Sequence, residues 1–86
     1  MRHCASPQFW KHYAALPAHV RENADRAFAL LKENPAHPSL RFARKGRGWS
    51  ARVCRGYRAL AKERAGCLVW CWIGPHDEYE RMIQDL

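Results

Sequence analysis

Two stretches decide the fold: Gly56-Tyr57-Arg58-Ala59-Leu60-Ala61 and, after a short polar turn, Cys67-Leu68-Val69-Trp70-Cys71-Trp72-Ile73-Gly74-Pro75-His76-Asp77-Glu78-Tyr79. They are typical of two adjacent strands followed by a helix that opens at a histidine. The connecting Arg64-Ala65-Gly66 is short and contains glycine, so a hairpin is the expected connection. Antiparallel pairing about this turn predicts that Arg58 lies opposite Trp72, to within one residue of register.

This pairing brings three polar side chains to one end of the sheet. The chain leaves the strand at Gly74, just beyond Trp72, so His76 is expected close to Arg58. Tyr79 follows three residues later and lies on the same side of the helix as His76. An arginine, a histidine and a tyrosine at one end of a sheet predict a phosphate-handling site.

The N-terminal half has the pattern of two helices. Residues 1–5 are expected to be a loose start, and Ser6-Pro7 is a good helix opening. Pro17 suits the first turn of a second helix, which Asn34-Pro35 ends. The apolar positions recur at helical spacing in both segments: Phe9, Trp10, Tyr13 and Leu16 in the first, and Val20, Ala24, Ala27, Phe28 and Leu31 in the second. A tight connection between them predicts an αα-hairpin.

The C-terminal half has the pattern of a sheet followed by a helix. We expect strands over 40–44, 49–54, 57–63 and 67–73, and a helix over 77–86. The first is an edge strand, while the strand over 67–73 is apolar on both faces and is therefore central and covered on both sides. The whole chain, 1–86, is then one α+β domain, in which an N-terminal αα-hairpin and a C-terminal helix pack on a four-stranded, mainly antiparallel, twisted sheet.

The charge balance indicates an anionic partner. The chain has 15 lysine and arginine residues against 8 acidic ones, a formal net charge of +7. A small basic domain of this kind suits a polyanion, either nucleic acid or an acidic protein segment. No apolar run is long enough for a signal peptide or a membrane span, so we expect a cytoplasmic protein without a membrane partner.

Four cysteines and five histidines raise the question of zinc. Cys67 and Cys71 share one face of a strand but lie about 13 Å apart, too far for two ligands of one tetrahedral ion. No Cys-x-x-Cys pair is present. We therefore expect no metal ion and no cofactor. Cys54, Cys67 and Cys71 lie in strand-like apolar runs, where we expect them to be reduced and to behave as small hydrophobic residues.

In their order and spacing, these segments resemble the RelE/ParE superfamily of toxins from bacterial toxin–antitoxin modules. The resemblance covers nearly the whole chain. It rests on Phe9-Trp10, Leu16-Pro17, Ala29 to Pro35, His37-Pro38-Ser39-Leu40, Trp49 to Val53, Tyr57 to Ala61, and Trp72-Ile73-Gly74 with His76 to Tyr79. It implies the RelE-like helix–helix–sheet–helix fold, which the patterns above indicate independently.

The resemblance implies two alternative activities. RelE-like members cleave messenger RNA without a metal, commonly on the ribosome, and so inhibit translation. ParE-like members inhibit DNA gyrase and are not nucleases. In both cases the expected partner is a cognate antitoxin whose acidic or amphipathic segment covers the basic groove; messenger RNA and the ribosome are further partners in the first case. A third alternative is a basic nucleic-acid binder without toxicity.

The choice among these alternatives depends on the site. Arg58 matches the arginine of the family's Tyr-Arg strand and suits neutralisation of a phosphate, while His76 suits acid or base chemistry. Tyr79 is the third candidate catalytic residue, and the candidate RNA-binding residues are Lys45, Arg47, Trp49 and Arg52. Whether Arg52 shares a face with Arg58 depends on the length of the turn at Arg55-Gly56.

Each candidate also has a structural alternative. His76 could cap the last helix and Tyr79 could dock it, and Trp49, Trp70 and Trp72 suit the core. His3, His12, His19 and His37 are expected at the surface, with no partner nearby in the sequence. Two departures from the family's nucleases are visible. Met82 stands where a second tyrosine is common, and the region of Ala51 and Arg52 has no clear counterpart of an acidic or lysine catalytic group.

Overall fold

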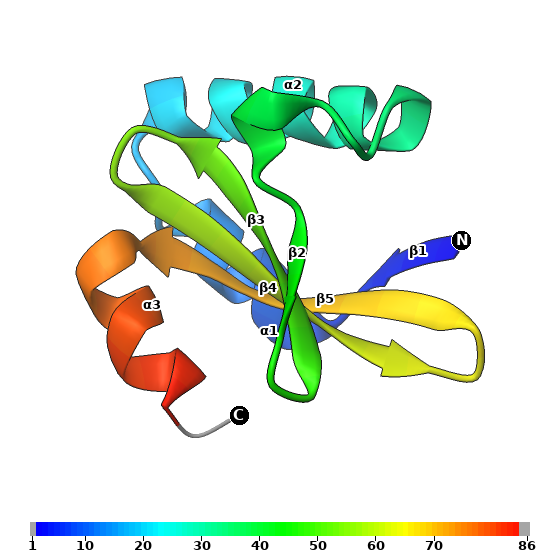
Figure 1. Cartoon of the computed structure of the whole chain (residues 1–86). Coiled ribbons are helices and arrows are strands. Elements are labelled where there is room, and N and C mark those ends of the chain that lie inside the picture. Colours follow the sequence, from blue (N-terminus) through cyan, green and yellow to red (C-terminus); the bar gives the residue numbers. More distant parts are fainter. Residues whose placement is uncertain (1, 85–86) are drawn as a thin grey trace.

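The computed structural model describes residues 2–84 and contains a five-stranded sheet with three α-helices (Figure 1). The sheet order is β1-β5-β4-β3-β2, and only β1 and β5 pair in parallel. The strands are β1 Arg2–Ala5, β2 Ala43–Lys45, β3 Gly48–Cys54, β4 Tyr57–Arg64 and β5 Cys67–Pro75. The helices are α1 Pro7–Ala14, α2 Ala18–Glu33, the 3-10 turn η1 Pro38–Leu40, and α3 His76–Ile83. The predicted α+β class is confirmed.

The helical hairpin begins and ends where the local sequence predicts. The Ser6 hydroxyl accepts a hydrogen bond from the Phe9 backbone N–H at 3.3 Å, with Pro7 in the first turn of α1. Pro17 has φ −57° and immediately precedes α2. At the other end of α2, the Asn34 backbone N–H donates to the Leu30 carbonyl at 2.7 Å. These boundaries follow from interactions within a few residues, which a sequence displays directly.

The expectation of a loose start at residues 1–5 is wrong. Arg2–Ala5 form β1, which pairs in parallel with β5 and places Cys4 opposite Val69. The Ser6 N–H continues the attachment by donating to the Trp70 carbonyl at 2.9 Å. A four-residue strand is too short to show an alternating pattern, and its partner lies more than sixty residues away. The sheet therefore has five strands rather than four.

The expected edge strand over 40–44 is also corrected. Pro38–Leu40 form a 3-10 turn, Leu40 is 2% exposed, and Arg41 has a left-handed φ of 44°. Extended structure starts only at Ala43. The apolar residues Leu40 and Phe42 both contact the core, so their alternation with basic residues resembled that of a strand.

Arg58 lies opposite Gly74, two residues from the predicted register. One residue of the difference comes from the turn, because Arg64 pairs with Cys67 and only Ala65-Gly66 connect the strands. The other comes from an irregularity after Leu60, where β5 holds one extra residue. The hairpin itself is confirmed, and the shift brings Arg58 closer to the start of α3.

Both faces of β5 are covered, as the sequence predicts. On one face Leu68, Trp70 and Ile73 join the main core with residues of α1 and α2. On the other face Trp72 packs with Leu60 and Tyr79, the last from α3. Figure 1 shows α2 across one face of the sheet and α3 at the other. The last helix begins at His76 and ends at Ile83; residues 85 and 86, which we also expected to be helical, lie outside the described part of the chain.

Candidate phosphate-binding site

The start of α3 is fixed beside the β3–β4 hairpin. The chain leaves β5 at Pro75, and the His76 backbone N–H donates to the Gly56 carbonyl at 2.8 Å. Gly56 has a left-handed φ of +83°, which suits the tight Arg55-Gly56 turn. Because Arg58 is two residues beyond Gly56, the first turn of α3 necessarily lies next to it.

Arg58, His76 and Tyr79 are brought together. Arg58 Nε donates a hydrogen bond to His76 Nδ1 at 3.3 Å. The Arg58 guanidinium carbon lies 6.0 Å from the centre of the Tyr79 ring, and the His76 and Tyr79 rings are 5.5 Å apart. The proximity expected from the sequence is therefore present in the folded chain.

A second partner of His76 is Glu80. The His76 Nε2 atom lies 2.9 Å from Glu80 Oε1, one turn further along α3. Because Nδ1 accepts from Arg58, Nε2 carries the proton and donates to the carboxylate. The pair therefore selects one tautomer of the imidazole. Sequence reasoning missed Glu80, although its spacing of four residues on a predicted helix is the signal that could have found it.

Arg58 lies in a positively charged environment. Its pKa is lowered from the ordinary value, chiefly by desolvation and further by the positive charges of Arg41 and Arg52. Arg58 still remains charged at neutral pH. Among residues 2–84 the only carboxylate within salt-bridge distance of a basic side chain is Glu80, beside His76, so no carboxylate in this part of the chain neutralises Arg58. Three arginines around one point attract an anion.

Arg52 shares the sheet face of Arg58. The two residues are direct partners in the β3–β4 ladder, and opposed residues in a ladder point to the same side. The turn has two residues, since Cys54 pairs with Tyr57. With a regular ladder beyond this turn Arg52 would point to the opposite face from Arg58, but the register shift between Arg52 and Cys54 makes the two residues direct partners. The question left open by the sequence is thereby answered.

Tyr79 is buried, with 5% of its surface exposed. Its hydroxyl donates to Ser50 Oγ at 3.3 Å, and its ring packs against Leu60 and Trp72. Gly74 makes room for this packing, because a Cβ there would lie 2.6 Å from the Trp72 ring. Tyr79 therefore holds α3 against the sheet, and its ring lies beside Arg58.

The candidate RNA-binding residues of the β2–β3 hairpin lie apart from this cluster. Lys45 pairs with Gly48 at the turn, and Arg47 lies within the turn. Arg52 lies four positions beyond Gly48 along β3, a distance of about 13 Å. Trp49 is on the opposite sheet face, stacked on Phe42 at 4.9 Å and donating to Glu63 at 3.1 Å. Trp49 is thus half-buried structure, and Trp70 and Trp72 are core as expected.

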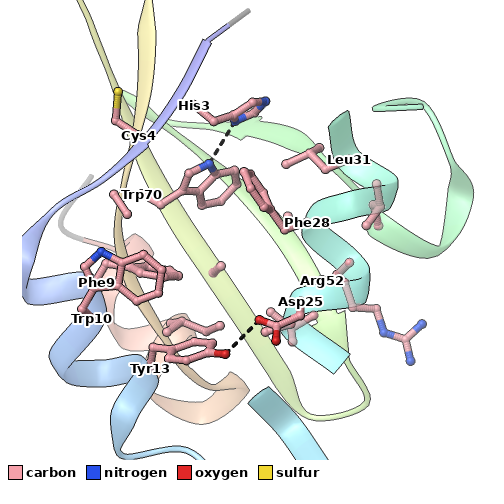
Figure 2. Close-up of a pocket in the computed structure, with 18 residues that line it drawn as sticks. His3, Cys4, Phe9, Trp10, Tyr13, Asp25, Phe28, Leu31, Arg52 and Trp70 are labelled. Carbon is pink, nitrogen blue, oxygen red and sulfur yellow. Dashed lines mark hydrogen bonds between the residues drawn. The ribbon is translucent and has the colours of Figure 1, made fainter. Parts of the chain in front are cut away.

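A separate pocket of about 280 Å³ lies between α1, α2 and the sheet (Figure 2). Figure 2 shows Phe9, Trp10 and Phe28 around it, with the Arg52 guanidinium directed away from it. Its polar contacts are internal: Tyr13 donates to Asp25 at 2.8 Å, and Trp70 Nε1 donates to His3 Nδ1 at 3.1 Å. The lining is almost entirely apolar, so this pocket is unsuited to a phosphate. The partner of His3 is thus distant in the sequence, whereas the expectation that His37 has no nearby partner is wrong, because its Nδ1 accepts from the Ser39 backbone N–H at 3.2 Å.

Residues 2–84 contain neither a metal-binding cluster nor a membrane-spanning helix. No group of three His, Cys, Asp or Glu side chains in this range is placed to hold a metal ion. No helix within it is long and apolar enough to cross a membrane.

Comparison of the fold with solved structures gives consistent neighbours. RelE in the RelB–RelE antitoxin–toxin complex from Methanococcus jannaschii superimposes with a TM-score of 0.69 at 10% identity, over 92% of this chain and 96% of that chain. YafQ from E. coli strain BL21(DE3) gives a TM-score of 0.70 at 18% identity, over 92% and 98%. The isolated RelE toxin of E. coli gives 0.62 at 15% identity, over 99% and 98%.

The chain has the RelE-like toxin fold. No protein-family model matches it, and no curated protein matches its sequence. The fold that the resemblance implies is therefore confirmed: a RelE-like sheet, with three helices on it, over nearly the full length of each chain. At such low identities the likeness concerns the fold alone, because one fold can host different activities.

Proposed function

We propose that this RelE-like chain is the toxin of a type II toxin–antitoxin module and that it cleaves messenger RNA on the ribosome without a metal ion. The observation that carries the proposal is the hydrogen bond from Arg58 to His76 Nδ1 beside Tyr79. It places a permanent cation and an imidazole at the same point of a strongly basic surface.

Arg58 is proposed to bind the scissile phosphate. Its guanidinium is held by His76 rather than by a carboxylate, and Arg41 and Arg52 add positive charge nearby. A phosphate oxygen is a stronger acceptor than a neutral imidazole, so bound RNA draws Arg58 away from Nδ1. Arg58 then neutralises the charge that develops on the phosphorus.

His76 is proposed as the general base. Once Arg58 has moved, the Nδ1 lone pair can accept the proton of the 2′-hydroxyl while that oxygen bonds to phosphorus and the bond to the 5′-oxygen breaks. Glu80 holds Nε2–H and stabilises the imidazolium that results. The 5′-oxygen receives its proton from water at this exposed edge, because the Tyr79 hydroxyl is engaged with Ser50.

The open part of the same sheet face is proposed to carry the flanking RNA. Lys62 and Arg64 follow Arg58 along β4 at alternate positions, so all three point to one side. Lys45 of β2 and Lys62 of β4 both pair with Gly48 of β3, so the three residues form one row across the sheet. Because the middle residue is glycine, no side chain lies between the two lysines. These cations lie about 13 to 20 Å from Arg58, a spacing suited to backbone phosphates beyond the cleaved one.

A cognate antitoxin is proposed as the protein partner. Two of the similar solved structures are RelB–RelE antitoxin–toxin complexes, from Methanococcus jannaschii and Pyrococcus horikoshii. In this chain a net charge of +7 would complement an acidic or amphipathic antitoxin segment over the basic face. Bound there, the segment would compete with RNA for Arg52, Arg58 and Lys62.

The test is induced expression in bacterial cells of wild type, Arg58→Ala and His76→Ala, with the 5′ ends of messages mapped within minutes. We expect cuts inside translated regions with the wild type and at least a hundredfold fewer with His76→Ala. His19→Ala is the matched control, since His19 is an exposed histidine of α2 outside the site, and it should cut like the wild type.

The other outcomes are informative. Growth arrest with intact messages would overturn the nuclease proposal and indicate a gyrase inhibitor, with His76 only opening α3. Cleavage retained by both variants would overturn the roles of Arg58 and His76. Salt-sensitive RNA binding without a growth phenotype would indicate a nucleic-acid binder that is not a toxin.

A further inference from the structure

Two cysteines meet where the first strand joins the sheet. Cys4 of β1 and Cys67 of β5 have their sulfur atoms 2.6 Å apart, although 63 positions separate them in the chain. In the parallel ladder Cys4 lies opposite Val69 and Cys67 lies opposite Arg2, so both side chains point to the same sheet face. A disulfide bond is about 2.05 Å long, so the sulfurs need only a small displacement to bond.

The pair is reachable from solvent. Cys4 is exposed and Cys67 is partly exposed, and both are thiols in the structure. Either sulfur can donate in the Cys4–Cys67 contact, and this hydrogen bond raises the pKa of the Cys67 thiol. Cys4 is the more exposed residue of the two, so its sulfur is the one that a small oxidant meets first.

We propose that Cys4 and Cys67 form a site of reversible oxidation, in which a small disulfide such as oxidised glutathione converts the two thiols into a β1–β5 disulfide. The site is separate from the Arg58–His76 cluster and does not depend on the proposed nuclease activity.

The reaction balances without a further reagent. The Cys4 thiolate attacks one sulfur of oxidised glutathione, forming a mixed disulfide and expelling one glutathione thiolate. Cys67, after giving its proton to that thiolate, attacks the Cys4 sulfur and expels the second glutathione. Two protein thiols lose two electrons and two protons, and one oxidised glutathione becomes two reduced ones.

The other two cysteines lack this arrangement. The Cys71 thiol donates to the Leu60 carbonyl at 3.6 Å, and burial raises its pKa. Burial also raises the pKa of Cys54, which lies at the far end of β3. Both are therefore poor nucleophiles. Cys71 is the better control because it lies in the same strand as Cys67, four residues further on.

Oxidation would link the N-terminal strand β1 covalently to β5. β1 is a short edge strand that holds His3 against Trp70 and Phe28 beside the apolar pocket. A disulfide closing 63 positions restricts the unfolded chain strongly. Oxidation should therefore raise the melting temperature by more than about 10 °C and slow amide exchange in β1.

The experiment is equilibration of the purified chain with mixtures of oxidised and reduced glutathione, followed by thiol counting, mass spectrometry and thermal unfolding. We expect the wild type to lose two of its four thiols, with a mass decrease of two hydrogens and no bound glutathione, and to recover them in excess reduced glutathione. Cys71→Ser should behave in the same way. Cys4→Ser and Cys67→Ser should form no internal disulfide and should show no rise in melting temperature.

Three results would overturn the proposal. The first is an internal disulfide that persists in Cys4→Ser or disappears in Cys71→Ser. The second is stable glutathione adducts on wild-type Cys4 without bond formation to Cys67, and the third is a disulfide between two chains. The Cys71→Ser protein also settles the assignment by peptide mapping, because Cys67 and Cys71 lie in one tryptic peptide.

Discussion

At the scale of single residues, the proposed base depends on the side chain that holds its second nitrogen. Glu80 accepts from His76 Nε2 and is 64% exposed, so solvent screens much of its charge. Glu80→Gln keeps an acceptor but removes the charge that stabilises the imidazolium. We therefore expect a roughly two- to fivefold slower single-turnover cleavage with unchanged RNA affinity. Glu78→Gln, an exposed change on the same helix, should leave the rate unaltered; equal losses in both variants would contradict a specific role for Glu80.

His3 gives a residue-level prediction about pH. Its pKa is lowered, first by desolvation against Trp70 and Phe28 and then by positive charge at the N-terminus and Lys32. When the pKa of a histidine is lower in the folded state than in the unfolded state, the unfolded state binds more protons at any pH between the two pKa values. The free energy of unfolding therefore rises with pH in that interval. Denaturant unfolding should show full stability above about pH 6.5 and a loss of stability as the pH falls from there through the lowered folded pKa. His3→Gln should flatten this dependence, whereas His19→Gln should preserve it.

At the scale of elements, the junction of β5 and α3 sets the position of His76. Gly74 lies where a Cβ would approach the Trp72 ring to 2.6 Å, and that ring is 4% exposed and packed against Leu60 and Tyr79. Gly74→Ala should therefore destabilise the fold by about 1–3 kcal/mol, measured by urea unfolding. It should also loosen α3, seen as faster amide exchange in its first turn. Gly66→Asn is the control, because asparagine tolerates the left-handed φ of +78° and the space there is open; an equal loss at Gly66 would indicate a general cost of replacing glycine.

At the scale of the whole molecule, the excess of positive charge is divided between two sheet faces. Lys45 shares the face of Arg58, while its neighbour Arg44 pairs with Trp49 on the other face, its guanidinium carbon 5.8 Å from the indole ring. Lys45→Gln should lower RNA affinity and reduce the slope of log K against log salt by about 0.7 to 1. Arg44→Gln makes the same charge change one residue away and should leave that slope unchanged. Equal effects would mean that net charge alone, rather than one face, attracts the RNA.

Much of this molecule can be predicted from the chain alone, because the relevant signals are local. Ser6-Pro7 and Pro17 mark helix starts through contacts within one turn, and Gly66 permits the β4–β5 turn in place. The approach of His76 to Arg58 also follows locally, since one hairpin and one helix start connect them. Glu80 was missed although its spacing from His76 is local as well.

The remainder depends on contacts between distant segments. β1 exists because the edge of β5 offers unpaired backbone groups to residues 65 positions earlier, as in the pair of Arg2 with Cys67. Four residues are too few to show a pattern that predicts this partner. The facing of Arg52 and the final register of Arg58 depend on two ladder irregularities, and a single extra residue reverses the facing of a side chain. Helix caps and apolar periodicity depend on neighbouring residues, so the sequence alone determines them. The strand register, the sheet face to which Arg52 points and the contact of Cys4 with Cys67 are decided only when the strands pack together.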